Sequence, residues 1–147
     1  MGGIFGAKRG IQMKDFYILL VDDNEGILYL LAETLILAGY SVSVAKNGSE
    51  ALKKLNSRFF DLIITDYEMP DMDGISLIKK TRELFPEMEA VLITGNPEAQ
   101  KIKEGKDAGA YFLFAKPFEI PDLISMIEGI REKKGPSPRR FFYGRSL

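Results

Sequence analysis

The sequence contains neither cysteine nor histidine. The absence of cysteine excludes disulfide bonds and thiolate metal sites. The absence of histidine excludes Ser-His and Cys-His catalysis, histidine metal ligation and a histidine proton switch.

Long apolar segments and targeting signals are absent too. The sequence has no run of 18 or more apolar residues, the length of a membrane span, so we expect no membrane partner. The N-terminus lacks the charged-then-apolar layout of a secretion signal, and we expect a cytoplasmic protein. With 147 residues, 46% of them apolar, the chain is expected to form one globular domain.

The formal net charge of −1 conceals an uneven layout. Residues 15–130 carry 11 basic and 20 acidic side chains, whereas residues 1–14 and 131–147 are basic. We predict a flexible glycine-rich arm over 1–14, one domain over 15–134 and a basic-aromatic tail over 135–147. The tail is too short for a helix-turn-helix unit, and we interpret it as a disordered end or a linker rather than a nucleic-acid contact.

Apolar runs alternate with amphipathic segments along the domain. The runs predict strands at 16–21, 40–45, 62–65, 90–93 and 111–115, and the segments predict helices at 25–38, 49–57, 76–85, 97–108 and 122–133. This alternation predicts an α/β fold, a doubly wound (βα)5 parallel sheet of the flavodoxin-like type with strand order 2-1-3-4-5.

Capping residues mark two of the predicted helix starts. Asn24 is predicted to cap the first helix, and Asn96-Pro97 to supply the N-cap and first residue of the fourth. We expect the fourth helix to be weakly packed, because Ile102 is its only large aliphatic residue and Gly105 interrupts it.

Four of the five predicted strands end in polar residues suited to phosphate chemistry: Asp22-Asp23, Asp66, Thr94 and Lys116. The predicted strand order places Asp22 and Asp23 beside Asp66 at one edge of the sheet. Three neighbouring carboxylates repel one another, and a divalent cation that prefers oxygen ligands, Mg²⁺ (or Mn²⁺), relieves the repulsion.

Thr94 and Lys116 complete a predicted phosphoryl receptor, with Asp66 as its nucleophile. We expect both to sit at solvent-facing strand ends. Each residue has an ordinary explanation when taken alone: Asp22 or Asp23 could cap a helix, Thr94 could simply end a strand, and Lys116 could be solvated. Their joint position at the correct strand ends favours the functional interpretation.

Over residues 15–134 the chain resembles the response regulator receiver family, the phosphoacceptor half of two-component signalling. The motifs that carry the resemblance are Asp22-Asp23, Asp66 followed by Met69-Pro70 and Gly74, Thr94-Gly95, and Gly109-Ala110 before Lys116-Pro117-Phe118. The resemblance implies that Asp23, Asp66 and the backbone carbonyl of Glu68 bind Mg²⁺ directly and Asp22 through water. It also implies phosphorylation of Asp66 by a histidine kinase or a histidine phosphotransfer protein.

The chain departs from this family at one position. Receivers often have Tyr or Phe three residues before the lysine, and here that residue is Leu113.

We expect a non-enzymatic phosphoacceptor that only hydrolyses its own acyl phosphate and signals through a protein target that is unknown. The alternatives are a receiver of a larger regulator with a DNA-binding or enzymatic output domain, and a hydrolase or flavin-binding domain of the same fold.

The first predicted helix is apolar on more than one side. One stripe is predicted to cover the sheet: Ile27, Leu30, Leu31, Thr34, Leu35 and Ala38. A second arc is predicted to be exposed and to receive the phosphodonor: Leu28, Tyr29, Ala32 and Ile36. The alternatives are that the N-terminal arm or a homodimer contact covers this arc.

Overall fold

The computed structural model describes residues 13–135. The predicted tail beyond Gly135 and the predicted arm before Met13 lie outside the described residues, and the domain limits at 15 and 134 stay predictions. Lys14 is joined to the body, because its backbone N–H donates to Gly39 O at 2.8 Å and its ammonium contacts Glu128 Oε2 at 2.6 Å.

Five parallel strands form one sheet in the order β2-β1-β3-β4-β5. The strands are β1 (Tyr17–Val21), β2 (Ser41–Ala45), β3 (Leu62–Asp66), β4 (Glu89–Thr94) and β5 (Phe112–Ala115). The helices are α2 (Glu25–Leu37), α3 (Gly48–Ser57), α4 (Gly74–Leu84), α5 (Ala99–Ala108) and α6 (Ile120–Lys134). The predicted fold class and strand order are confirmed.

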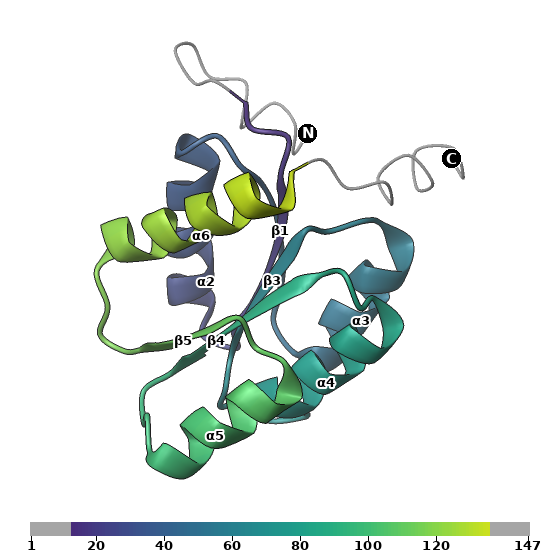
Figure 1. Ribbon diagram of the computed structural model, residues 1–147, viewed down its shortest axis with the longest axis vertical. Coiled ribbons are helices and arrows are strands. Elements are labelled where there is room, and N and C mark those ends of the chain that lie inside the picture. Colours follow the sequence, from purple (N-terminus) through teal and green to yellow (C-terminus); the bar gives the residue numbers. More distant parts are fainter. Residues whose placement is uncertain (1–12, 136–147) are drawn as a thin grey trace.

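Helices cover both faces of the sheet (Figure 1): α2 and α6 lie on one face, and α3, α4 and α5 on the other. The central strand β3 is therefore buried throughout, as its unbroken apolar run predicts. Alternate residues of the strands point to two separate core clusters, so Ile64 packs with α2 and α6 while Ile63 packs with α3 and α4. Among the described helices, none combines the length and apolar character that crossing a bilayer requires.

The capping prediction for the first helix is confirmed, and that for the fourth is wrong. The Asn24 side chain accepts from Ile27 N at 3.1 Å, which is the expected cap of α2. Helix α5 begins at Ala99 after Glu98, and no side chain caps it. Asn96 lies three residues before the first residue of the helix, and its side-chain amide donates to Glu98 Oε1 at 2.7 Å.

The prediction of which α2 residues face the sheet is wrong, because the buried stripe is rotated about the helix axis by about one residue from the predicted one. The buried residues are Leu28, Leu31, Ala32 and Leu35. Leu28, assigned to the exposed arc, is 1% exposed, whereas Leu30, assigned to the core, is 63% exposed. Because nearly every position of this helix is apolar, two neighbouring stripes fit the helical period equally well, and contact with the sheet and α6 decides between them.

Gly105 has a packing role that the sequence analysis missed. The residue is buried in α5, and a Cβ added there would lie 3.2 Å from Leu92 Cδ2 of β4. Gly105 therefore lets α5 approach the sheet closely, in addition to lowering its intrinsic helix propensity. Ile102, the large aliphatic residue of this helix, is exposed rather than buried.

Candidate functional site

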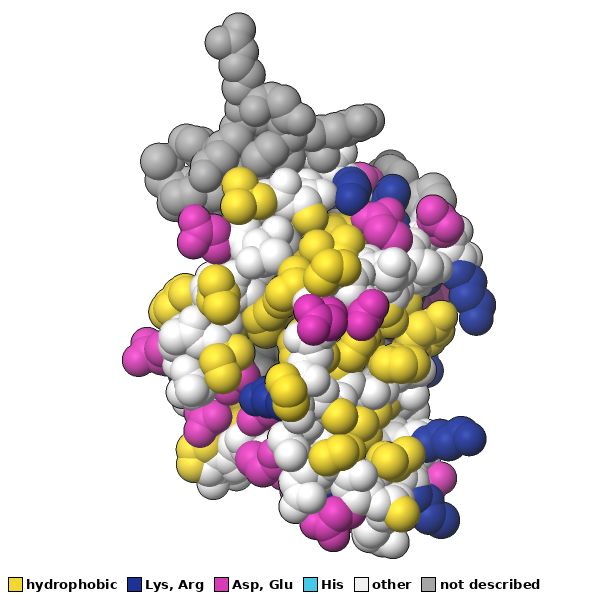
Figure 2. Space-filling view, turned by 90° about the vertical axis from the view of Figure 1, so that its left-hand side faces the viewer, with side chains coloured by type: hydrophobic (Ala, Val, Ile, Leu, Met, Phe, Trp, Pro, Cys, Tyr) yellow, Lys and Arg dark blue, Asp and Glu magenta, His cyan; other side chains and the backbone are white. Residues whose placement is uncertain are grey.

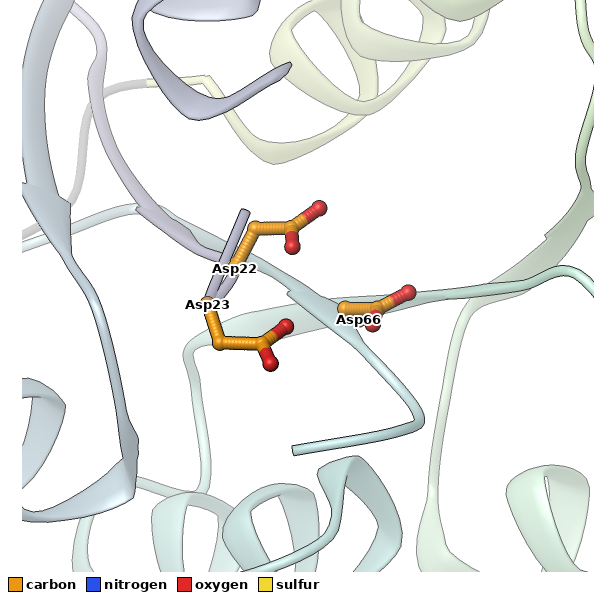
Figure 3. A group of neighbouring side chains, drawn as sticks. All are labelled: Asp22, Asp23 and Asp66. Carbon is orange, nitrogen blue, oxygen red and sulfur yellow. The ribbon is translucent and has the colours of Figure 1, made fainter. Parts of the chain in front are cut away.

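Asp66 is the last residue of β3, at the edge where the carboxyl ends of the strands meet. Val21 of β1 pairs with Thr65 of β3, so Asp22 and Asp23 emerge beside Asp66. One carboxylate oxygen from each of the three residues lies within 4.8 Å of the others. Figure 3 shows the side chains of Asp22 and Asp23, from the end of β1, on the same side as that of Asp66. The predicted carboxylate cluster is therefore present.

The Asp66 carboxylate is buried beside a single lysine. The side chain is 6% exposed, and its Oδ1 is fully buried. The Lys116 ammonium lies 3.0 Å from Oδ1 and 3.6 Å from Asp22 Oδ2 as an ion pair. One positive charge does not balance the neighbouring carboxylates, so the cluster favours a further cation.

The pKa values of the cluster reflect burial and crowding. Burial raises the pKa of Asp66 to about 6, with Asp22 and Glu68 adding to the rise and Lys116 opposing it. Burial also raises the pKa of Asp22, against a hydrogen bond from Asn24 N and the charge of Lys116. Burial alone would lower the pKa of Lys116, but its contacts with Asp66 and Asp22 outweigh this effect and raise it.

Thr94 and Lys116 are brought to the same place by the adjoining strands. Asp66 pairs with Ile93 of β4, and Thr94 pairs with Ala115 of β5. The backbone N–H of Lys116 donates to Thr94 O at 2.8 Å, which joins the two strand ends. The expectation that Thr94 faces solvent is wrong, because the residue is fully buried at 0% exposure. The Lys116 side chain is 28% exposed.

The acidic residues after Asp66 have three different roles, which the sequence analysis did not distinguish. Asp73 caps α4 by accepting from Ser76 N at 2.8 Å. Asp71 binds the start of α3, accepting from Gly48 N at 3.1 Å and from Ser49 N at 3.2 Å. Glu68 alone turns back to the site, where its carboxylate accepts from the Thr94 hydroxyl. The spacing of Asp73 before an apolar periodic segment could have revealed its capping role.

Gly74 closes the loop that follows Asp66. Its N–H donates to Tyr67 O at 2.8 Å, and a Cβ at this position would lie 2.3 Å from Asp66 O. No real Cβ makes so close a contact, so a side chain here would displace the backbone of Asp66. The glycine of the motif is therefore a steric requirement for holding Asp66 at this edge.

Leu113 occupies the position where the resembling family often has an aromatic residue. It is half-buried and packs with the cluster under α3, α4 and α5. Its neighbours Phe112 and Phe114 lie on the other face of β5 with their ring centroids 4.8 Å apart, where Phe112 is exposed and Phe114 is buried. The aromatic side chains of β5 therefore flank this position without occupying it.

The donor set at this edge fits a hard divalent cation. Three carboxylates offer oxygen ligands within 4.8 Å of one another, and Lys116 places one positive charge beside two of them. Mg²⁺ prefers oxygen ligands of this kind and usually retains several waters in addition. Asp23 is exposed, so the cluster is open to such a hydrated ion.

Comparison with known proteins identifies relatives along most of the chain. Residues 18–128 match the model of the response regulator receiver domain. Sporulation initiation phosphotransferase F of Bacillus subtilis (strain 168) is 37% identical over 111 residues, which is 76% of this chain and 90% of that protein. The chain spans only 25% and 28% of the length of two matched transcriptional regulators, DctD and GlrR.

Solved structures show the same fold. The receiver domain protein (CheY-like) from Methanospirillum hungatei JF-1 is 32% identical with a TM-score of 0.78, over 81% of this chain and 95% of that one. The response regulator TrrA from Thermotoga maritima, crystallised in complex with Mg(2+)-BeF, is 31% identical with a TM-score of 0.72, over 78% of this chain and 98% of that one. With the family model matching most of its length, the chain belongs to the response regulator receiver domain family.

Proposed function

We propose that Asp66 is the phosphoacceptor of this receiver and that Asp22, Asp23, Thr94 and Lys116 form its phosphorylation site. The observation that carries the proposal is the buried Asp66 carboxylate, whose Oδ1 lies 3.0 Å from the Lys116 ammonium and which sits within a cluster of three carboxylates. A carboxylate kept in this state is reactive toward an electropositive centre such as phosphorus. Receivers are phosphorylated by histidine kinases or phosphotransfer proteins, so the donor is a phosphohistidine.

In the transfer step, a carboxylate oxygen of Asp66 forms a bond to phosphorus as the bond between phosphorus and the donor's imidazole nitrogen breaks. The electron pair of that bond stays on the imidazole nitrogen, and Asp66 becomes an acyl phosphate. The Lys116 ammonium neutralises charge on the phosphoryl oxygens, and the Thr94 hydroxyl donates a hydrogen bond to one of them. Hydrolysis reverses the modification when water attacks phosphorus, releasing inorganic phosphate and the Asp66 carboxylate.

Asp22, Asp23 and Asp66 would hold Mg²⁺ (or Mn²⁺), together with the backbone carbonyl of Glu68. The fit of the carboxylate cluster to a hard cation supports this assignment, as does the Mg(2+)-BeF complex of the related TrrA. When bound, the cation supplies positive charge beside the phosphoryl group. Without it, the three carboxylates repel an incoming phosphoryl dianion.

The direct test is mass spectrometry after treatment with acetyl phosphate and Mg²⁺. We expect one phosphoryl group on wild-type protein, located by peptide mapping at Asp66. Chelation of the metal with EDTA should prevent the modification, and so should Asp66→Ala. Modification that persists in either case contradicts the proposal.

The exposed face of α2 is the proposed docking surface for the phosphodonor. Tyr29, Leu30 and Leu37 are 53%, 63% and 48% exposed, and the helix starts two residues after Asp23. Figure 2 shows hydrophobic groups interspersed with acidic ones on the side of the molecule that is on the left in Figure 1. An apolar face beside the reactive carboxylate suits a helical partner that must bring its histidine there.

Leu30→Glu tests this surface, and Leu84→Glu is its matched control. Leu84 is an exposed leucine at the end of α4, on the opposite face of the sheet. We expect Leu30→Glu to reduce phosphotransfer from the cognate kinase by at least tenfold, on the scale of a lost interface anchor, and to leave acetyl phosphate modification unchanged. Loss with both donors, or with neither, would show that this face is not where the donor binds. A homodimer contact would appear as a concentration-dependent mass in light scattering.

A receiver within a longer regulator is the second candidate for the output. This candidate is favoured because the chain matches only 25% and 28% of the length of DctD and GlrR. The chain matches 90% of the sporulation phosphotransferase, which favours a stand-alone receiver that signals by binding another protein. Immunoblotting of the source cells measures the mass of the native protein and separates these two. In either case we expect slow hydrolysis of the acyl phosphate as the receiver's own chemistry, with no other substrate.

A further inference from the structure

The Glu68 side chain lies between the phosphorylation site and helix α5. Its carboxylate oxygens are 3.2 and 3.4 Å from the Thr94 hydroxyl oxygen. On its other side, Glu68 Oε2 is 3.4 Å from the ammonium of Lys101, in the first turn of α5. The exposed Glu68 side chain thus contacts both the buried Thr94 and the surface helix α5.

The hydroxyl of Thr94 is already engaged in this arrangement. A threonine hydroxyl has one hydrogen to donate, and here it points to Glu68. The same oxygen accepts from Asn96 N at 3.1 Å. A phosphoryl group on Asp66 that accepts a hydrogen bond from Thr94 must therefore displace the Glu68 carboxylate from this hydroxyl.

Lys101 attaches the N-terminal end of α5 to the body of the protein. No side chain caps this end, and the buried residues of the helix, Gly105 and Ala108, lie in its second half. The Lys101 side chain is only 19% exposed, because it pairs with Glu68 and covers the Tyr67 ring with its ammonium 4.5 Å from the ring centroid. Both of these partners belong to the loop that follows Asp66.

A phosphoryl group on Asp66 would disturb all of these contacts at once. It carries about −1.5 to −2 charge at neutral pH and would repel the Glu68 carboxylate while competing for the Thr94 hydrogen. The Glu68 side chain is 48% exposed, so it can turn into solvent without burying its charge. Lys101 would then lose its carboxylate partner and, with it, part of the attachment of α5.

We propose that the Glu68 carboxylate is a positioning residue that occupies the Thr94 hydroxyl and anchors α5 through Lys101 until phosphorylation of Asp66 displaces it. This deepens the proposed function and rests on Asp66 being the phosphoacceptor. Glu68 acts here through its side chain, independently of its backbone carbonyl. Two consequences follow: Glu68 weakens binding of anions at Asp66, and it slows local opening of α5 in the unmodified protein.

The test compares Glu68→Gln, which keeps the shape and removes the charge, with Glu104→Gln as its control. Glu104 is a half-buried acid on α5 that accepts no hydrogen bond from Thr94. With beryllofluoride and Mg²⁺ as the probe, Glu68→Gln should bind roughly fivefold more tightly by calorimetry, as expected for removing one nearby like charge. Glu104→Gln should remain within about twofold of wild type on the same scale.

Hydrogen exchange of the metal-free, unmodified protein supplies the second readout. Amides of residues 102–105, the first of the helix with intrahelical acceptors, should exchange at least about threefold faster in Glu68→Gln and in Lys101→Gln, because both remove the anchor. The double variant should exchange no faster than either single variant, since the two side chains share one contact. Glu104→Gln should match wild type.

The proposal requires both changes, and it is overturned if Glu68→Gln behaves like Glu104→Gln in either measurement. These results are distinct from failure of the proposed function. If wild-type protein takes up neither beryllofluoride nor a phosphoryl group at Asp66, the function assigned to Asp66 is wrong. Exchange in the metal-free protein would still report on the anchor in that case.

Discussion

Two acidic side chains in this protein have opposite surroundings. Glu128 of α6 receives hydrogen bonds from Lys14, Tyr40 and Arg131, which come from three separate parts of the chain. Burial would raise the pKa of Glu128, but these donors outweigh it and lower the pKa to about 2. Asp66 has an ion-pair partner in Lys116, but burial and the neighbouring acids Asp22 and Glu68 raise its pKa to about 6.

The difference separates a structural acid from a reactive one. Glu128 links the segment before β1, the residue preceding β2, and α6, and its capacity to accept hydrogen bonds is used. Asp66 is held at the end of a strand where neighbouring acids destabilise its charged form. Groups with a perturbed pKa of this kind are typical of functional sites.

The largest expected difference between the two acids is in modification. Asp66→Asn should abolish phosphorylation by acetyl phosphate, because the amide cannot serve as the acceptor. Glu128→Gln should be modified at a rate close to that of wild type. Time courses of intact mass under Mg²⁺ measure both. A comparable loss in Glu128→Gln would mean that the cluster around Glu128 controls the site.

Glu128→Gln should destabilise the fold by on the order of 2 kcal/mol at pH 7. The folded pKa of Glu128 is depressed from 4.5 to about 2, so its stabilising effect is present above about pH 4.5 and is lost as the pH falls toward 2. Urea unfolding at pH 7 and pH 3.5 should therefore show a smaller deficit at the lower pH. Glu132→Gln, an exposed acid one turn later, is the control. A deficit independent of pH would indicate loss of packing instead.

In metal-free protein, Asp66→Asn should stabilise the fold, which is the opposite of the effect expected for Glu128→Gln. The folded pKa of Asp66 is raised from 3.8 to about 6, so ionisation destabilises the fold above pH 6 and ceases to do so as the pH falls toward 4. The full pKa difference implies roughly 3 kcal/mol, and we expect about 1 to 2 kcal/mol because Lys116 loses its partner. Unfolding in EDTA at pH 8 and pH 4.5 measures the gain. Destabilisation at pH 8 would contradict the view of Asp66 as a strained acid.

Thr94→Ala and Lys116→Ala should have modest effects on stability while impairing signalling more than Glu128→Gln does. Thr94→Ala leaves the Asn96 N–H without its acceptor, a loss of about 1 kcal/mol. Lys116→Ala should also cost less than about 3 kcal/mol, the size typical of a broken buried ion pair. Chemical unfolding, alongside protection of α5 in the phosphorylated protein, measures both effects. A larger stability loss in either variant would make that residue structural.

The smallest expected difference is in the protection of α5 and α6 from hydrogen exchange. Helix α6, which carries Glu128, buries Leu123, Ile127 and Ile130, whereas α5 buries only Gly105 and Ala108. Hydrogen exchange should therefore show residues 99–108 as the least protected helical segment of the unmodified protein. Protection in α5 equal to that of α2 would remove the basis for a mobile output helix.

Much of the site could be predicted because it depends on strand ends. An apolar run followed by Asp66, Thr94 or Lys116 marks the end of a strand, and parallel order brings those ends to one edge. The face of α2 could not be predicted in the same way. Its apolar residues surround the helix, so Leu28 and Leu30 exchanged their expected roles.

The sequence alone determined the fold class, the strand order and which polar residues stand at the strand ends, because hydrophobic periodicity and strand-end chemistry are local properties of the chain. Contacts between distant segments were decided only by the tertiary structure. The pairing of Glu68 with Thr94 and Lys101, the enclosure of Glu128 and the burial of Thr94 each join residues far apart in sequence. Such contacts depend on distances between packed elements, which no local pattern encodes.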